Sequence, residues 1–304
     1  MAQRKPSYTD HEGFLMPMGF PLEAFRSALQ YTARPSDIFI CAYPKCGTTW
    51  LQYIVYLILH EGKALPAGDS MTKEIPHLEE VGKAAVEDLD SPRCIKSHLP
   101  LHMMPHHSEA SYLYIARNPF DCAVSFYHHT RGFAQHYDFV NGSFDEFFEC
   151  FLLGEVDFGD YFANLVPWYK SRDRDNILFL TYEQMKTQPL ETIRSIGSFL
   201  GAGAAAVVRD RKVLKDVIRN SSYDSMSRDQ QRWSSQRPDN MPAFVPILFE
   251  CTVMFAAHLM SITYLIRCGL FPGGKSGSPD PRTTDDKFLM VINVDGETSS
   301  VKEI

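Results

Sequence analysis

Short apolar runs alternate along the chain with longer segments of helical character. The clearest runs are Ile38–Ala42, Tyr112–Ala116 and Ile177–Thr181, which have the length and near-continuous apolar character of buried strands. Arg93–His98 is a further short strand candidate. Strands that alternate with helices form parallel sheets, which bind ligands at the carboxyl ends of the strands. The pattern therefore predicts an α/β fold with a central parallel β-sheet flanked by helices.

The predicted helices begin and end at recognisable residues. The segment Leu51–Leu59 is too long and too apolar for another strand, so we expect a core helix there. Asn118 is a good N-cap and Pro119 a good first residue for a helix over Phe120–Thr130. Further helices are expected over Pro21–Tyr31, over about Glu79–Leu89 with an acidic face, and from Thr192 or earlier to Leu200, where Gly201 ends the helix.

Composition narrows the class of protein. The chain has 304 residues, of which 44% are hydrophobic and 22% charged, enough for one large α/β domain with or without a tail. A net charge of −7 argues against broad binding to nucleic acid or to an acidic membrane. The first residues lack the apolar stretch of a signal peptide, and seven cysteines without a CxxC pair suit reduced thiols. We therefore expect a cytoplasmic protein.

The loop Tyr43–Trp50, between the first strong strand and its helix, has the composition of an anion-binding site. Backbone N–H groups around Gly47 and the positive end of the helix dipole would face one anion, and Lys45 adds a positive charge. An ordinary turn with a surface lysine is the alternative interpretation. Lys45 precedes Gly47, unlike the lysine of nucleoside triphosphatase loops, which disfavours a nucleotide kinase or ATPase.

The candidate functional residues lie at one edge of the predicted sheet. Lys45, His98, Arg117 and Tyr182 each lie at or just past the carboxyl end of a predicted strand. Because these ends meet at the same edge of a parallel sheet, we expect the four side chains to form one site.

Four segments, in this order, resemble the motifs of the cytosolic sulfotransferases. They are Tyr43–Trp50, Arg93–Pro100, Tyr114–Pro119 and Leu178–Glu183, and the resemblance covers roughly residues 15–245. It implies a single domain over residues 1–245 with the P-loop-NTPase-like sulfotransferase fold. It also implies transfer of a sulfuryl group from 3′-phosphoadenosine 5′-phosphosulfate (PAPS) to a hydroxyl or amine of a small apolar acceptor, such as a phenol, catecholamine or steroid. The product nucleotide would be 3′-phosphoadenosine 5′-phosphate (PAP). A Golgi carbohydrate sulfotransferase is disfavoured because we see no N-terminal anchor.

The resemblance also implies residue roles. His98 would be the general base, while Lys45 and Lys96 would neutralise charge that develops on the transferred group. The nucleotide would be bound by Lys45, Cys46, Gly47, Thr48, Thr49, Trp50, Arg117, Ser125, Tyr182, Ser221, Tyr223 and Met226. The acceptor would contact Phe20, Lys96, His98, Phe133, His136, Tyr137 and Phe139, although packing is an equal alternative for the aromatic residues.

Two further features concern cysteine and histidine. Cys46 replaces a small residue of the family such as serine, and a thiol between Lys45 and a helix N-terminus is expected to have a lowered pKa and to oxidise readily.

A histidine cluster could indicate metal, but no Glu-x-x-His or cysteine pair supports it, so we expect no metal. Its members are His102, His106, His107, His128 and His129.

Beyond Val245 the chain departs from the family pattern. An Arg-Lys-Gly segment that would bind the 3′-phosphate is absent, and losing two charge-assisted contacts would weaken nucleotide binding by roughly 10²–10⁴-fold. The family's dimer motif lies in the same missing segment, so we do not expect that homodimer. We expect residues 246–304 to form an atypical segment, with an apolar helix over Ile247–Ile266 packed on the sheet rather than crossing a membrane, and disorder beyond Gly273. The alternative function is a catalytically impaired variant or decoy.

Overall fold

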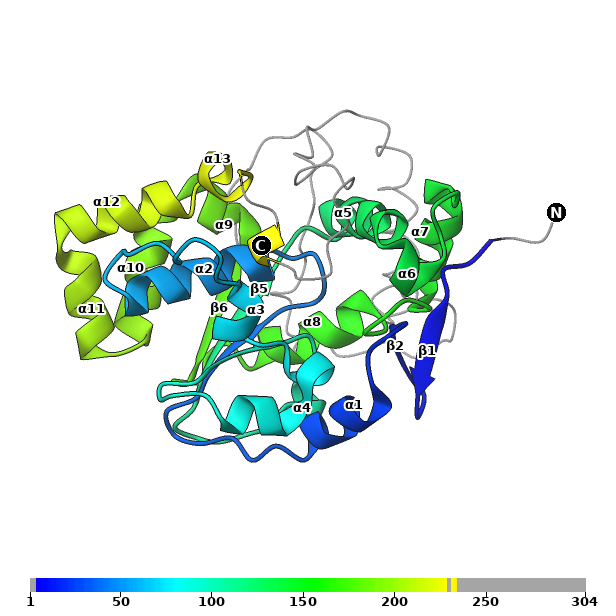
Figure 1. Cartoon of the computed structure of the whole chain (residues 1–304), viewed down its shortest axis with the longest axis horizontal. Helices are drawn as coiled ribbons and strands as arrows, with labels where there is room; N and C mark the ends of the chain where they lie inside the picture. Colours follow the sequence, from blue (N-terminus) through cyan, green and yellow to red (C-terminus); the bar gives the residue numbers. More distant parts are fainter. Residues whose placement is uncertain (1–3, 229–230, 234–304) are drawn as a thin grey trace, which may run out of the picture. The chain divides into compact units, whose positions relative to one another are not determined.

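The computed structural model describes residues 4–228 and 231–233. Within these residues, a four-stranded sheet has the strand order β4-β3-β5-β6, and every neighbouring pair is parallel. The strands are β3 (Ile38–Cys41), β4 (Cys94–Ser97), β5 (Ser111–Ala116) and β6 (Ile177–Thr181). The predicted parallel α/β architecture is therefore confirmed (Figure 1).

The helices follow the strands as the sequence pattern predicts. Asn118 caps the helix after β5, since its side-chain oxygen accepts a hydrogen bond from the Phe120 backbone N–H, and Pro119 is the first helical residue. The helices are α1 (Leu22–Leu29), α2 (Thr48–Leu59), α3 (Met71–Glu74), α4 (Leu78–Glu87), α5 (Pro119–Gly132), α6 (Ala134–Tyr137), α7 (Phe144–Leu153), α8 (Tyr161–Lys170), α9 (Tyr182–Thr187), α10 (Pro189–Phe199), α11 (Ala202–Arg209), α12 (Arg211–Asn220) and α13 (Tyr223–Met226). Two short 3₁₀ turns are η1 (Leu101–Met103) and η2 (Gln231–Trp233).

Some described elements were not predicted from the sequence. An antiparallel hairpin of β1 (Tyr8–His11) and β2 (Phe14–Pro17) precedes α1. Helices α7, α8, α11 and α12 were also missing from the prediction. The hairpin strands are only four residues each, too short for a clear periodic signal.

The register of the sheet brings the strand ends together. Cys41, the last residue of β3, pairs with Ser97 of β4 and with Tyr114 of β5. Ala116 at the end of β5 pairs with Thr181 at the end of β6. The segments that follow these strands therefore leave from one edge of the sheet.

The two faces of the sheet are covered by different helices. On one face, Phe39 stacks on Tyr112 at a ring-centroid distance of 5.0 Å, and Tyr114 stacks on Trp168 of α8 at 4.9 Å. Residues of α1 and α4 complete this core, including the buried Phe25 and Leu78. On the other side α2 packs along β3, and α10, α11 and α12 pack on α2 (Figure 1). The sheet edge is thus held between two rigid layers.

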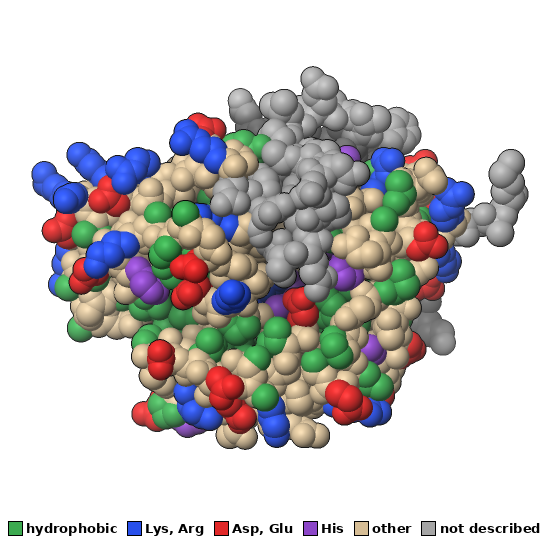
Figure 2. All heavy atoms as spheres, viewed as in Figure 1, with side chains coloured by type: hydrophobic (Ala, Val, Ile, Leu, Met, Phe, Trp, Pro, Cys, Tyr) green, Lys and Arg blue, Asp and Glu red, His purple; other side chains and the backbone are tan. Residues whose placement is uncertain are grey.

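The surface carries its positive charges unevenly. Figure 2 shows Lys and Arg side chains gathered near α11 and α12. The exposed residues there are Arg209, at the end of α11, and Arg211, Lys212, Lys215 and Arg219 of α12. Among the described residues, no helix combines the length and apolar character needed to cross a bilayer. The helix predicted over Ile247–Ile266, and the remainder of segment 246–304, lie outside the described residues.

A buried ion pair fixes the opposite, amino-terminal end of the sheet. Arg93 Nε lies 2.8 Å from Asp37 Oδ1, and the two side chains are 7% and 0% exposed. The hydroxyl of Tyr31 and the backbone N–H of Arg34 donate to Asp37 Oδ2 at 2.7 and 2.8 Å. This network joins the residues that precede β3 and β4.

Removing Arg93 should destabilise the fold, because Asp37 would keep its buried charge without its cation. We expect Arg93→Met to lower the free energy of unfolding by about 3 kcal/mol in urea titrations. The control is Arg26→Met, whose guanidinium is 44% exposed and pairs with Glu12 at 2.7 Å; its loss should cost less than about 1 kcal/mol. Equal losses in the two variants would contradict this assignment.

Candidate active site

The loop between β3 and α2 has the geometry of an anion cradle. Gly47 has a φ of 104° and is the N-cap of α2, whose first turn contains Thr48, Thr49 and Trp50. The first backbone N–H groups of a helix have no partner within the helix, and they carry the positive end of its dipole. The hydroxyl of Thr48 is also buried without a hydrogen-bond partner in the described part of the chain. These donors fit a phosphate or sulfate group.

Lys45 belongs to the same loop and is directed toward α5. Its Nζ lies 3.4 Å from Nδ1 of His129. His129 in turn packs on the ring of Phe133 at 4.4 Å. The lysine is only partly exposed, so its positive charge is set within the site.

Three side chains from different elements meet beside Gly47. The guanidinium carbon of Arg117 lies 4.3 Å from the ring centroid of Tyr182, and Arg117 Nη1 donates to the Lys45 carbonyl at 3.1 Å. Trp50 meets the other side of this cluster, with its ring 5.6 Å from that of Tyr182. Arg117 Nε and Trp50 Nε1 are buried and have no partner within the described residues. The cluster therefore offers aromatic surface and unused N–H donors together, as a nucleotide requires.

His98 lies just past β4 with a defined tautomer. Its Nδ1 is 2.7 Å from the Ala42 carbonyl oxygen. Because a carbonyl oxygen only accepts, Nδ1 carries the proton and Nε2 is the acceptor nitrogen of the neutral ring. Burial lowers the pKa of His98 well below its usual value, and the charges of Lys96, His77 and Lys45 act in the same direction. The ring is therefore neutral near pH 7.

Lys96 precedes His98 by two residues on β4. Burial lowers the pKa of its amine, whereas the carboxylates of Glu80 and Glu79 oppose that shift. Its charge contributes to the lowered pKa of His98, so the two groups lie close enough to interact. Lys45, Lys96 and His98 are thus one electrostatic group.

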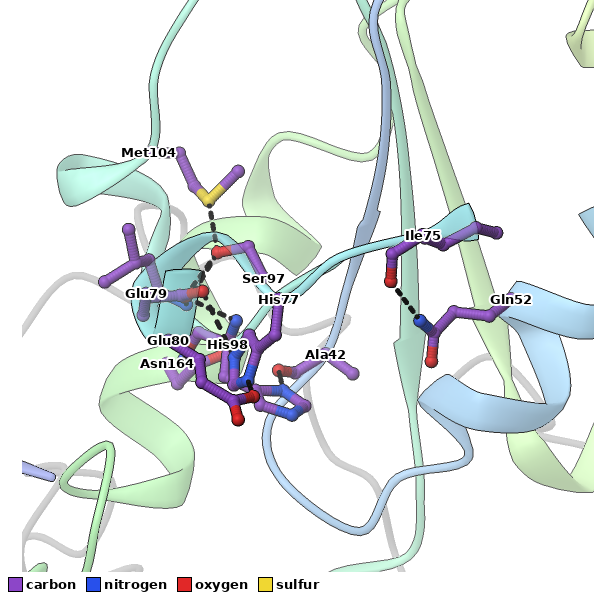
Figure 3. A network of polar contacts seen from close by, with 11 residues as sticks. Ala42, Gln52, Ile75, His77, Glu79, Glu80, Ser97, His98, Met104 and Asn164 are labelled. Carbon is purple, nitrogen blue, oxygen red and sulfur yellow. Dashed lines mark hydrogen bonds and ion pairs between the residues drawn. The ribbon is translucent and has the colours of Figure 1, made fainter. Parts of the chain in front are cut away.

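A buried network behind His98 was missed by the sequence analysis. Figure 3 shows Glu79 of α4 directed at the end of β4. His77 lies next to both residues, with Nε2 3.1 Å from Glu79 Oε2 and its ring 4.9 Å from that of His98. Helix α4 was predicted to have an acidic face, and the structure buries the Glu79 side chain, which is 0% exposed. The Gly82 φ of 77° kinks α4 at this point. No local sequence signal reports a contact between residues so far apart in the chain.

The predicted acceptor residues divide into two groups. Phe20 contacts His77 edge-on at 5.5 Å, and Phe133 contacts His136 at 6.0 Å, with Phe20 and His136 themselves 6.4 Å apart. His77 meets the His98 ring at 4.9 Å. Phe20, Phe133 and His136 are therefore connected to His98 through ring contacts.

Tyr137 and Phe139 are more deeply buried. The Tyr137 hydroxyl donates to Asp157 at 2.9 Å, and its ring lies 5.6 Å from that of His129. Phe139 is 0% exposed and packs against Phe147. Its surroundings match the packing alternative given for it above.

The remaining predicted nucleotide residues lie on α5 and around α13. Ser125 is partly exposed in the second turn of α5. The Ser221 hydroxyl is bonded to the Val217 carbonyl at 2.7 Å, whereas Tyr223 is 49% exposed. The Met226 carbonyl accepts from Trp233 Nε1 at 2.8 Å, and Trp233 packs on Tyr53 of α2 at 4.7 Å. Met226 is thus linked to α2 through Trp233, and the nucleotide role of all these residues stays a prediction.

The expectation for Cys46 is wrong. Its side chain is 0% exposed and lies under the loop, with Sγ 3.8 Å from Cys122 Sγ. Burial raises the pKa of the Cys46 thiol, and the contact with Cys122 adds to this shift. Its backbone N–H donates to the Tyr43 carbonyl at 3.3 Å, so it closes the turn itself. The loop directs the Cys46 side chain into the core, and this burial outweighs the helix dipole in setting the pKa of the thiol.

The histidine cluster does not assemble in the described residues. Within them, no group of three or more histidine, cysteine, aspartate or glutamate side chains is arranged to hold a metal ion. His102 is exposed, whereas His129 contacts Lys45.

The fold and the site together define an α/β protein with an anion cradle beside aromatic rings at the carboxyl edge of its parallel sheet. A family model described as "Sulfotransferase domain" matches residues 35–245, more than half of the chain. The chain therefore belongs to the sulfotransferase family. A second model, described as the ActD subunit of alternative complex III, matches residues 230–304, nearly all of which lie outside the described residues.

Individual relatives agree with this assignment. Sulfotransferase 1C2 of Homo sapiens is 33% identical over 209 residues, which cover 66% of this chain and 68% of that protein. Sulfotransferase 1B1 of Mus musculus is 32% identical over 217 residues, covering 66% and 68%. The crystal structure of mouse sulfotransferase SULT7A1 complexed with PAP has a TM-score of 0.68 at 21% identity, covering 86% of this chain and 93% of that one. At that identity the likeness shows the fold alone.

Proposed function

We propose that this chain transfers a sulfuryl group from PAPS to a hydroxyl or amine of a small apolar acceptor, with His98 as the general base. The observation that carries the proposal is the state of His98. Its ring is buried and neutral, Nδ1 is held by the Ala42 carbonyl at 2.7 Å, and Nε2 is the acceptor nitrogen. A base must be unprotonated and correctly oriented to take a proton, and this ring meets both conditions.

The proposed nucleotide fits the groups around Gly47. The loop and the α2 N-terminus would hold the 5′-phosphosulfate, with Lys45, Thr48 and Thr49 as further donors. Trp50, Tyr182 and Arg117 would border the adenosine, since two aromatic rings and a guanidinium meet there. The PAP in the crystal structure of mouse SULT7A1, whose fold this chain shares, supports the choice of nucleotide.

The chemistry would proceed by in-line displacement. PAPS supplies a sulfuryl group with PAP as the leaving group. His98 Nε2 takes the acceptor's proton while a bond forms from the acceptor oxygen or nitrogen to sulfur and the bond from sulfur to the bridging oxygen breaks. Lys45 and Lys96 neutralise the charge on the leaving and transferred oxygens, which lowers the barrier through electrostatics.

The alternative proposal is a decoy that binds ligands without turnover. It is favoured by one observation, that the family match ends at residue 245, where the expected Arg-Lys-Gly segment is missing. The two proposals share the nucleotide site and differ only in whether product forms.

A cytoplasmic location is part of the proposal. Cys41, Cys46, Cys94, Cys122 and Cys150 are buried free thiols in the described part of the chain, which suits a reducing compartment.

The nucleotide site should be sensitive to a single added methyl group. In Gly47→Ala the new Cβ would lie 2.8 Å from Tyr182 Cδ2, so Tyr182 must shift, which disturbs its contacts with Trp50 and Arg117. We expect PAP affinity, measured by calorimetry, to fall at least about tenfold. The control is Gly201→Ala, which has a similar φ of 105° but no atom within 4 Å of the added carbon. Both variants carry backbone strain. Equal PAP affinities in the two would contradict the placement of the nucleotide.

Replacing His98 should abolish proton transfer without affecting the nucleotide. We expect His98→Gln to lower kcat by about 10²–10⁴-fold while PAP affinity is unchanged. Because the pKa of His98 is lowered, the ring becomes protonated only well below pH 6.5. The wild-type kcat should therefore not change with pH around pH 7, and it should fall at more acidic pH. Steady-state kinetics with PAPS and a phenol panel measure both effects.

The control is His102→Ala, because His102 is exposed near the same loop. This variant should keep the wild-type kcat. Full activity of His98→Gln would remove His98 as the base, and an acidic limb centred near pH 6.5 would show that the ring is not held neutral by burial.

A further inference from the structure

We propose that Glu79 is the positioning residue that holds His98 in its reactive orientation, an inference that rests on the proposed function. One carboxylate oxygen, Oε1, accepts three hydrogen bonds from the end of β4 and the residues that follow it. The donors are the Ser97 hydroxyl at 2.6 Å, the His98 backbone N–H at 2.7 Å and the Leu99 backbone N–H at 2.9 Å. Figure 3 shows this carboxylate beside the His98 segment, with dashed lines that mark these bonds.

Glu79 supplies acceptors for backbone N–H groups that have no partner in the sheet. Ser97 is the last residue of β4, so the N–H groups of His98 and Leu99 lie beyond the strand ladder. A buried N–H without a partner is costly, and bonds to a charged acceptor are about twice as strong as neutral ones. Glu79 thus fixes a backbone turn where regular structure has ended.

His98 is consequently held at three points. Glu79 binds its backbone N–H, Asn164 Nδ2 donates to its carbonyl at 3.0 Å, and its ring Nδ1 donates to Ala42. The first two restrain the main chain and the third sets the ring. Because Nε2 is left as the reacting atom, its position depends on all three restraints.

The other carboxylate oxygen of Glu79 faces His77. His77 Nε2 lies 3.1 Å from Glu79 Oε2, and the two side chains are 6% and 0% exposed. Burial alone would raise the pKa of Glu79, but His77 and the Ser97 hydroxyl outweigh it, so the carboxyl is ionised. His77 also contacts the His98 ring edge-on at 4.9 Å. Glu79 therefore contacts the His98 backbone and His77 contacts the His98 ring.

This arrangement predicts a specific kinetic effect. A displacement of about 1 Å at a reacting group can cost about 10² in rate. Glu79 has no contact with the Lys45 loop, Arg117 or Tyr182 among its hydrogen bonds and ion pairs in the described residues. Its loss should therefore lower kcat without changing nucleotide affinity.

The test compares Glu79→Ala and Glu79→Gln in the full-length chain, with Glu87→Ala as control. Glu87 is exposed at the end of the same helix, so Glu87→Ala should leave kcat and PAP affinity unchanged. We expect Glu79→Ala to lose about 10² in kcat at unchanged PAP affinity. Glu79→Gln keeps an oxygen that can accept all three bonds, so it should retain kcat within about tenfold of the wild type. Similar losses in the alanine and glutamine variants would overturn the role of the three bonds.

A second readout does not depend on turnover. Histidine NMR, with the His98 resonance assigned from His98→Gln, should show a ring that stays neutral well below pH 6.5 in the wild type. In Glu79→Ala the His98 pKa should move up toward about 6.5, because the released ring becomes hydrated. An unchanged titration in that variant would overturn the proposal. If the wild type transfers no sulfuryl group, the proposed function fails, yet this titration still decides whether Glu79 positions His98.

A second variant tests the proposal in case Glu79→Ala does not fold. If Glu79→Ala is not folded, Ser97→Ala removes one of the three donors and leaves the carboxylate in place. We then expect a several-fold loss of kcat with unchanged PAP affinity, because two backbone bonds remain. Wild-type kcat in Ser97→Ala would overturn the proposal.

Discussion

The carboxyl edge of the parallel sheet is the constraint on which the rest of the site depends. Because Cys41 pairs with Ser97 and Tyr114, and Ala116 with Thr181, the strand-end segments emerge side by side. The register therefore brings together an anion loop, a histidine, an arginine and a tyrosine that are distant in sequence. Core packing on both faces of the sheet holds that register, since a shift by one residue would turn Phe39 and Tyr112 away from their partners.

Buried polar contacts convert this shared edge into a chemical site. The bond from His98 to Ala42 joins the segment after β4 to the one after β3, and the bond from Arg117 to the Lys45 carbonyl joins those after β5 and β3. In a site of low dielectric such bonds are strong, and their loss leaves costly unpaired groups. The same burial keeps the His98 ring neutral. The stability of this edge and the neutral state of His98 thus have a common physical origin.

The sequence predicts this site only in part. The strands and the loop around Gly47 were predictable, because apolar runs, a capping asparagine and a glycine act locally. Glu79 was not, since its partners lie about 18–20 residues away and a helix with several acids resembles a solvated face. Cys46 was misjudged for a related reason: its pKa depends on which way the side chain points, and the turn directs it into the core. Residues 246–304 lie outside the described residues, so the predictions made for them rest on sequence alone.

The central claim is that the chain transfers a sulfuryl group rather than only binding a nucleotide. The most direct measurement incubates the purified full-length chain with radiolabelled PAPS and a panel of phenols, steroids and amines, and quantifies PAP and labelled product together. We expect at least one acceptor to give labelled product in an amount equal to that of PAP. Binding of PAP, demonstrated on the same preparation, with no labelled product from any acceptor would contradict it and favour the decoy.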